Sequence, residues 1–433
     1  MEPRAGDVVS APPPAAAPGS LRTVAENAAW VGGAGLVVKP VWFAFVTVLC
    51  ARVLGAEGYG ALTTAMSLVA IAFSFTGWGV ETYVVREVAA DAGRAPEMFA
   101  SFLGLRAVLA VVAVAGSMAA GAALGYGPAL LGAVLVACAY QAVTSLTGYV
   151  QGYLQGLERM RTQGAVIALE RTLTVGLGTA ALLVWRTPSG ALAGMALGAA
   201  LAALVALRWL RRSVPDAARR VDVGLVRRTL RPLAPFAAAG FLGVLFFRVD
   251  TVMVEGLLGE AEAGRYGLAF RVVEALSMVF LAVNTAAYPR LSKLASGGAP
   301  GEFWRVVAVI TVGMAGACVA LSVGVASFAR PAIAWAVADP ELEASAGILA
   351  VLCWSLPLTA VRTLFDTVLV ARGDQRFVAG ALAVAVVANV VSNAVLIPTL
   401  GSTGAAVTTI GSEALLLGVY AVRLARRPAR ARS

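Results

Sequence analysis

The feature that most constrains the fold is a series of apolar tracts, each of a length that can cross a lipid bilayer. A transmembrane helix needs about 20 predominantly apolar residues. Hydrocarbon offers no hydrogen bonds to the backbone, so tracts of this length predict helices. About twelve tracts are present, near residues 27–50, 61–85, 101–124, 128–153, 163–185, 189–210, 233–258, 264–288, 303–327, 345–371, 376–397 and 402–424.

The composition agrees with an all-α polytopic membrane protein. Hydrophobic residues make up 59% of the chain and charged residues only 13%, whereas soluble domains carry roughly 25% charged residues. The chain has no histidine, which excludes a catalytic histidine and a histidine metal site. The sequence therefore predicts a membrane protein with neither a metal nor a cofactor.

Arginine and lysine in the short loops predict the orientation, because such residues are in excess on the cytoplasmic side. One set of alternate loops is rich in them and the other carries more acidic residues. The basic set holds Arg86, Arg94, Arg159, Arg161, Arg211, Arg212, Arg219, Arg220, Arg227, Arg228, Arg231, Arg290, Lys293, Arg372 and Arg376. Both termini are therefore predicted to be cytoplasmic in a bacterial plasma membrane. The net charge of +10 follows from this topology, without nucleic acid as a partner.

The tracts divide into two groups of six, on either side of a basic joint. This division predicts five parts along the chain. They are a disordered cytoplasmic tail (1–24), an N-lobe (25–212), a basic cytoplasmic linker (213–232), a C-lobe (233–425) and a basic tail (426–433).

The two halves resemble each other at three points in the same order. "RVLGAEGYGALTTA" resembles "GLLGEAEAGRYGLAF", "YLQGLERMR" parallels "VLVARGDQRF", and "TPSGALAGMALG" resembles "PTLGSTGAAVTT". Any two hydrophobic chains share some likeness, but the common order favours a duplication. Repeats that bracket a substrate site are typical of transporters.

One glycine-rich stretch, "GEAEAGRY", has the glycine spacing of a phosphate-binding loop in Gly259 and Gly264. Arg265 and Tyr266 stand where that loop requires Lys and Ser or Thr. The stretch also falls in a predicted outer loop, away from ATP. The sequence therefore predicts that the protein is not an ATPase.

Four further stretches carry a resemblance to a known family. "ARVLGAEGYGAL", "RVDTVMVEGLLGEAEAGRYGLAFRVVEALSMVFLAVNTAAYPRLSKL", "VARGDQ" and "ANVVSNAVLIPTLGSTGAAVTT" are similar to the polysaccharide-transporter, or oligosaccharide flippase, family. That family belongs to the multidrug/oligosaccharidyl-lipid/polysaccharide exporter superfamily. The resemblance covers nearly the whole chain after residue 25.

The resemblance implies a V of two six-helix lobes, with helices one, two, seven and eight lining a central cleft. It implies the movement of sugar units linked to undecaprenyl phosphate or pyrophosphate across the plasma membrane. The lipid-linked oligosaccharide and the bilayer would be partners, as would a polysaccharide polymerase or glycosyltransferases of the same pathway. Lipid II flippases of the superfamily usually have two further helices, whereas its multidrug antiporters also have twelve.

Three intramembrane pairs of opposite charge have spacings that bring them together or nearly so. Residues three or four apart share a helix face, and neighbours lie about 100° apart. Each pair is either a self-neutralised pair or part of the cleft. The pairs are Arg271 with Glu274, Arg362 with Asp366, and Glu170 with Arg171.

Arg248 and Asp250 differ from these pairs, because two residues of helix turn their side chains about 200° apart. Arg248 shares a face with Thr251 and Glu255, while Asp250 faces the opposite side. We expect Arg248 to meet the cleft. Asp250 either lines the cleft or anchors a neighbouring helix.

Lys39 and Arg106 lie within spans and have no local partner. Unpaired cations in a span usually mark a pathway. By the family resemblance, Lys39, Arg248 and Arg271 line the cleft and meet an anionic lipid-linked sugar. Arg106 is either a cleft residue or a structural charge.

Two other functions compete with a flippase. A cation-coupled multidrug antiporter needs unpaired carboxylates in its cleft, whereas the candidates here are mostly cationic. A polytopic glycosyltransferase or polymerase needs a large loop with clustered carboxylates, and the predicted outer loops are too short. The sequence therefore favours a non-enzymatic exporter of lipid-linked oligosaccharide.

Overall fold

The computed structural model describes residues 38–77, 79–213, 222–296, 300–337 and 339–426. The described residues are helical almost throughout and contain no strand. The predicted tail at residues 1–24, and all but the first residue of the tail at 426–433, lie outside the described residues.

The first half of the chain forms a bundle that starts with helical residues 38–43. Its elements are η1 (Ala44–Leu49), α2 (Cys50–Gly77), α3 (Val80–Ala90), η2 (Ala92–Arg94), α4 (Ala95–Ala123), α5 (Pro128–Gly156), α6 (Met160–Trp185) and α7 (Pro188–Ser213). Gly55 interrupts α2 with a φ of +67°. This break divides the long helical stretch Val38–Ala90 into two segments.

The second half forms a matching bundle. Its elements are α8 (Val223–Leu258), α9 (Glu260–Ser296), α10 (Pro300–Val337), α11 (Pro340–Glu343), α12 (Ser345–Leu352), α13 (Ser355–Ala371), α14 (Gln375–Leu400) and α15 (Ser402–Arg426). The pair formed by α11–α12 and α13 is bent by 49°. By length and hydropathy the described residues hold 10 candidate spans, or 11 with the bent pair. Residues 27–37 of the first predicted span lie outside the described residues.

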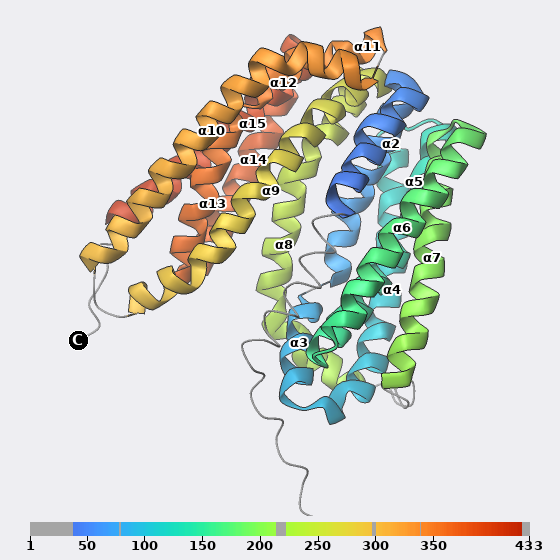
Figure 1. Cartoon of the computed structure of the whole chain (residues 1–433), viewed down its shortest axis with the longest axis vertical. Helices are drawn as coiled ribbons and strands as arrows, with labels where there is room; N and C mark the ends of the chain where they lie inside the picture. Colours follow the sequence, from blue (N-terminus) through green and yellow to red (C-terminus); the bar gives the residue numbers. More distant parts are fainter. Residues whose placement is uncertain (1–37, 78, 214–221, 297–299, 338, 427–433) are drawn as a thin grey trace, which may run out of the picture.

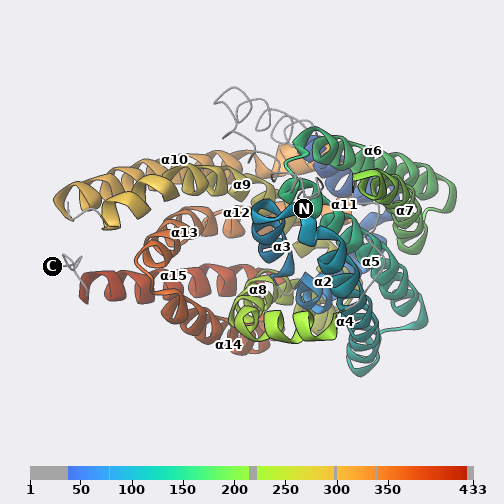
Figure 2. The same cartoon turned by 90° about the horizontal axis from the view of Figure 1, so that it is seen from below.

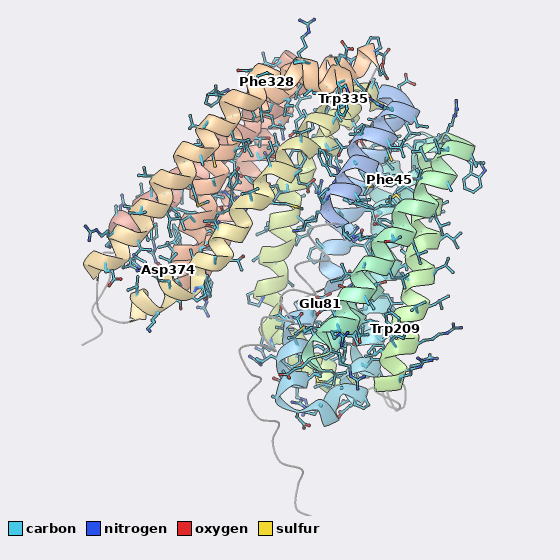
Figure 3. The ribbon with its side chains drawn as sticks, viewed as in Figure 1. Phe45, Glu81, Trp209, Phe328, Trp335 and Asp374 are labelled. Atoms are coloured by element: carbon cyan, nitrogen blue, oxygen red, sulfur yellow. The ribbon has the colours of Figure 1, made fainter. Side chains whose placement is uncertain are left out.

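The two bundles form the predicted V. Figure 1 shows α4–α7 on one side and α9–α15 on the other, meeting near α2 and α11 and diverging toward the end where α9 and α15 stop. Figure 2, seen from below, shows the two groups of helices apart at that open end. The outer faces are apolar, as a lipid-facing surface requires. Phe328 and Trp335 on α10, for example, are 70% and 80% exposed (Figure 3).

Two glycines hold the lobes together at the closed end. A β-carbon at Gly60 of α2 would lie 1.7 Å from the carbonyl oxygen of Glu260, and one at Gly264 of α9 would lie 2.1 Å from that of Ala56. Small residues let helix backbones approach closely in membranes. The stretch "GEAEAGRY" therefore serves a helix contact.

The backbone conformation repeats between the two halves, as the three similar stretches of sequence predict. At each of the three points where the two halves resemble each other, a residue with positive φ interrupts the helical backbone in both halves. The second and third of these residues are separated by the same number of residues in each half. The paired residues are Gly55 and Gly259, Glu158 and Gly373, and Arg186 and Gly401. The duplication is therefore visible in conformation even where glycine is replaced.

The predicted linker is partly helical, because α8 begins at Val223 rather than at residue 233. Leu225, Val226 and Leu233 pack against the core of the N-lobe. The backbone N–H of Asp222 also donates to Ser101 Oγ on α4, at 2.8 Å. The first turns of α8 thus pack on the N-lobe core, and the rest of the helix packs against α2 of the N-lobe as well as against α9 and α14 of the C-lobe.

Candidate functional site

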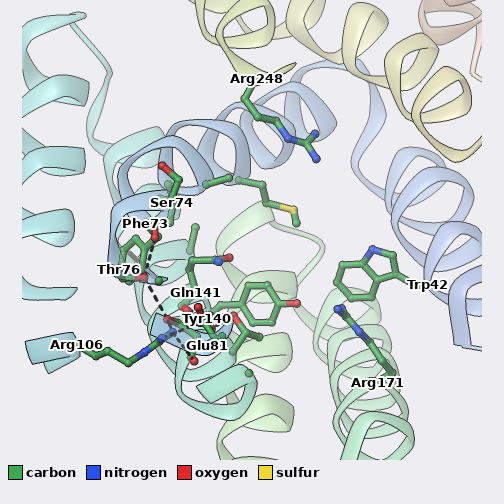
Figure 4. A pocket seen from close by; sticks show the side chains of 18 of the residues that line it. Trp42, Phe73, Ser74, Thr76, Glu81, Arg106, Tyr140, Gln141, Arg171 and Arg248 are labelled. Atoms are coloured by element: carbon green, nitrogen blue, oxygen red, sulfur yellow. Dashed lines mark hydrogen bonds and ion pairs between the residues drawn. The ribbon is translucent and has the colours of Figure 1, made fainter. Parts of the chain in front are cut away.

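A cavity of about 450 Å³ lies between the lobes, and we call it the central cavity. Its walls come from the first span, the second span with its two segments α2 and α3, and α4, α5, α6, α8 and α9. The helices that the resemblance implies therefore line it, together with three more from the N-lobe. Its polar and aromatic lining includes Trp42, Glu81, Arg106, Tyr140, Gln141, Thr144, Ser145, Arg171, Arg248 and Arg271 (Figure 4).

Two of the predicted cleft cations, Arg248 and Arg271, line the central cavity. Both guanidinium groups form ion pairs with the carboxylate of Glu274, and the Arg271 contact measures 3.1 Å. The pair predicted from the spacing of Arg271 and Glu274 is therefore confirmed. One carboxylate facing two guanidinium groups leaves a positive charge at this wall.

Lys39 is exposed and is not among the residues that line this cavity. The aromatic residue one turn further along the helix, Trp42, lies in the wall instead. Arg171 of α6 stacks on the Trp42 ring, with its guanidinium carbon 4.8 Å from the ring centroid. The sequence had left two alternatives for Arg171, a self-neutralised pair with Glu170 or a place in the cleft. That carboxylate accepts a hydrogen bond from Gln151 at 3.1 Å and does not line the cavity.

Arg106 lacks a local partner, as predicted, but it has partners on two other helices. Its guanidinium donates to Glu81 Oε1 of α3 at 2.7 Å and to Ser145 Oγ of α5 at 2.6 Å. It also lies over the ring of Tyr149. Arg106 therefore borders the cavity while it ties three N-lobe helices together.

The polar wall contributed by α5 was missed in the sequence. Gln141, Thr144, Ser145 and Gly148 recur at intervals of three and four residues and face the cavity. That periodicity is the signal of one helix face. It was present in "QAVTSLTG" and could have identified the wall.

Asp250 points away from Arg248, as the helical spacing predicted, and is almost fully buried inside the C-lobe. Its carboxylate accepts hydrogen bonds from Tyr266 Oη at 3.0 Å, Thr409 Oγ1 at 2.8 Å and Asn393 Nδ2 at 2.6 Å. These donors come from α9, α15 and α14. Asp250 thus anchors α8 to three neighbouring helices.

A small cavity of about 30 Å³ adjoins Asp250, which is roughly the space that one water molecule occupies in the liquid. Among the described residues, no group of three His, Cys, Asp or Glu side chains is placed to hold a metal ion.

The prediction that Arg362 pairs with Asp366 is wrong. Arg362 Nε donates to Glu413 Oε2 of α15 at 2.5 Å, and both side chains are buried. Asp366 lines a different cavity, and its Oδ1 has no hydrogen-bond partner among the described residues. Helical spacing allowed the local pair, but tertiary packing offered Arg362 a closer carboxylate.

Glu255 also lies away from the central cavity. It stands near the end of α8, at the closed end of the V, and its Oε2 has no hydrogen-bond partner among the described residues. The shared face with Arg248 therefore does not carry it into the central cavity.

The two lobes, the V and the cavity between them define the fold of this chain. Two solved structures show the same fold. An inward-facing multidrug resistance MATE family transporter of the MOP superfamily has a TM-score of 0.72 at 15% identity, covering 90% of this chain and 94% of the other. The lipid II flippase MurJ, in an inward closed conformation, has a TM-score of 0.70 at 11% identity, covering 91% and 87%.

A third structure, of a MOP superfamily transporter from Pyrococcus furiosus, has a TM-score of 0.62 at 15% identity and covers 93% of this chain and 95% of the other. The sequence pattern of the polysaccharide biosynthesis protein family matches residues 24–295, and that of MatE matches residues 235–395. The chain therefore belongs to the polysaccharide biosynthesis protein family. Comparison with curated protein sequences finds no match.

Proposed function

We propose that this protein is a flippase that moves an oligosaccharide linked to undecaprenyl phosphate or pyrophosphate across the plasma membrane, for cell-surface polysaccharide. The observation that carries this proposal is the excess of arginine in the central cavity. Arg106, Arg171, Arg248 and Arg271 line it. Among the described residues, two carboxylates, Glu81 and Glu274, form ion pairs with them.

The chemistry of the cavity suits a phosphate-linked sugar. Guanidinium groups bind phosphate through charge-assisted, often bidentate, hydrogen bonds. Each sugar hydroxyl moved bare into hydrocarbon would cost about 4–8 kcal/mol, and the polar α5 wall offers hydrogen bonds in exchange. Trp42 and Tyr140 add aromatic surface beside the arginines. The headgroup would therefore cross through the cavity rather than through lipid.

The end at which the V opens supports an orientation in the membrane. The open end carries the loops that are rich in arginine, which the charge rule assigns to the cytoplasm. We infer a state open to the cytoplasm with both termini on that side, and alternating access by rocking of the lobes. A polymerase and glycosyltransferases of the same pathway would act on the substrate before and after it crosses.

A reconstituted flipping assay tests the proposal. Purified protein in proteoliposomes is given a fluorescent lipid-linked sugar, and Arg248→Ala is compared with wild type. We expect the rate to fall about tenfold, because a hydrogen bond to a charged group contributes about 1.5–3 kcal/mol. Arg265→Ala, on α9 but outside the cavity, is the matched control. If Arg248→Ala leaves flipping and glycan export unchanged at normal protein levels, the proposal is wrong.

A cation-coupled multidrug antiporter is the second candidate. The match to MatE over residues 235–395 supports it. A drug-susceptibility test in a deletion strain separates the two functions, because loss of a flippase changes surface glycan while loss of an antiporter raises drug sensitivity.

A further inference from the structure

A second cavity, inside the C-lobe, is larger than the central cavity, and we call it the C-lobe groove. Its volume is about 1090 Å³, which reaches the upper end of the range of about 300–1,000 Å³ for ligand pockets. It lies between α8, α9, α13 and α14, where α8 and α9 diverge from the closed end (Figure 1). Its large apolar side chains are Phe246, Phe247, Met278, Phe280, Val378 and Leu382.

The polar groups of the C-lobe groove are mostly satisfied within the protein. Thr363 Oγ1 donates to the carbonyl oxygen of Thr359 at 2.8 Å and accepts from Asn284 Nδ2 at 2.9 Å. Arg362 is paired with Glu413. Asp366 has one oxygen with no partner among the described residues, and Gln375 and Arg376 are further polar residues of the lining. A ligand here would meet a mainly apolar surface with few free hydrogen-bonding groups.

The C-lobe groove adjoins the central cavity through one residue. Glu274 lines the groove, and the same carboxylate pairs with Arg248 and Arg271 in the wall of the central cavity. The inner end of an apolar groove therefore stands directly beside a phosphate-sized cluster of positive charge. Such a neighbourhood matches an amphiphile with an anionic head and a long apolar chain.

We propose that the C-lobe groove binds the apolar chain of a polyprenyl phosphate lipid while its phosphate meets Arg248 and Arg271. This inference rests on the proposed function and adds to it a site for the chain. A chain that followed its headgroup into an open cleft would be exposed to water, and burial in the groove avoids that cost. The groove shields the chain close to the headgroup.

Binding measurements with two lipids test the groove separately from the cations. Undecaprenyl phosphate and a short phosphate with two isoprene units are titrated onto the purified full chain in detergent. Ala239→Trp on α8 and Ala379→Trp on α14 fill the groove from opposite walls. We expect each variant to weaken the binding of undecaprenyl phosphate about tenfold, as loss of a few buried methylenes would. The affinity for the short phosphate should stay within about twofold of wild type.

A tryptophan on the outer face of the same helix is the matched control. Val387 on α14 is 63% exposed and lines neither cavity, so Val387→Trp should bind both lipids as wild type does. Arg248→Ala should weaken both lipids, because both carry the phosphate. Unchanged binding of the short phosphate also shows that the groove variants are folded.

The outcomes separate the two proposals. If the groove variants bind undecaprenyl phosphate like wild type while Arg248→Ala weakens it, the groove inference is overturned and the proposed function stands. If Arg248→Ala weakens the binding of neither lipid, the proposed function fails. Ethidium, a hydrophobic cation, is titrated as a third ligand. If the groove variants lose binding of ethidium but still bind undecaprenyl phosphate like wild type, the groove binds a hydrophobic cation near Asp366 and the inference is overturned.

Discussion

Arg52 of the N-lobe donates a hydrogen bond from Nε to the carbonyl oxygen of Ala336, and its Nη2 donates to the neighbouring carbonyl of Trp335. Both carbonyls belong to the last turn of α10 in the C-lobe. The last four carbonyls of a helix have no partner within the helix, and a cation there is favoured by the helix dipole. One arginine thus joins the lobes at the closed end.

Removing that arginine should loosen the closed end. We expect Arg52→Ala to raise the labelling of a cysteine placed at Ser74, in the central cavity, by a membrane-impermeant maleimide added on the closed side. The increase should be about tenfold, the effect of losing a charged hydrogen bond of about 1.5–3 kcal/mol. The four native cysteines are buried, which keeps background labelling low.

The chain offers a matched control for Arg52. Arg265 also donates to a backbone carbonyl near the closed end, that of Glu341 at 3.1 Å, but both residues lie in the C-lobe. Arg265→Ala should therefore leave labelling unchanged. Equal labelling in the Arg52 and Arg265 variants would show that the contact between the lobes does not keep the end closed.

The glycine contact makes a second prediction about the same end. A methyl group at Gly60 would meet the backbone carbonyl of Glu260 at 1.7 Å, so Gly60→Ala must push α2 and α9 apart. We expect higher labelling from the closed side and a lower Tm. Gly104→Ala on α4, where a β-carbon meets nothing within 4 Å, should change neither. A Gly60 variant with wild-type Tm and labelling would disprove the tight contact.

The anchor at Asp250 predicts a loss of stability on neutralisation. Tyr266, Thr409 and Asn393 all donate to this carboxylate. In Asp250→Asn, an amide NH₂ would face at least one of these donors. An unsatisfied buried donor costs about 1–3 kcal/mol, so the Tm in detergent should fall clearly. An unchanged Tm would mean that the three donors find other acceptors.

The buried pair of Arg362 and Glu413 predicts a larger effect. Breaking a buried ion pair by removing one partner typically costs about 3–5 kcal/mol, so Glu413→Gln should lower the Tm strongly. Asp366→Asn should have little effect, since no ion pair joins Asp366 to Arg362. If Asp366→Asn lowered the Tm more than Glu413→Gln did, Arg362 would pair with Asp366, as their spacing suggested.

Local spacing explains which parts of the site could be predicted from the sequence. Arg271 and Glu274 pair because residues three apart on a helix are neighbours whatever surrounds them. The partners of Arg106 and Asp250 lie on other helices, so spacing could only show that the local partner was missing. The fold itself was predictable, because the lengths of the apolar tracts and the glycine breaks are local properties.

The position of Lys39 outside the lining of the central cavity has a similar cause. Composition marks a lysine in a span as a candidate, but only the helix rotation decides whether it or Trp42 meets the cavity. The start of α8 was missed for the opposite reason. Its arginines suggested a solvated linker, whereas Leu225, Val226 and Leu233 form an apolar stripe that packs on the N-lobe.

Because α8 contacts helices of both lobes, it connects the movement of one lobe to that of the other. Its first turns pack on the N-lobe core, and its longer part contacts α2 of the N-lobe as well as α9 and α14 of the C-lobe. A change in the angle of the V must therefore move α8 relative to at least one lobe. Pro232 and Pro235 lie inside α8, and proline leaves backbone carbonyls one turn earlier without their helical hydrogen bond. Bending α8 at Pro232 and Pro235 would therefore break fewer helical hydrogen bonds than bending it where every backbone N–H is bonded.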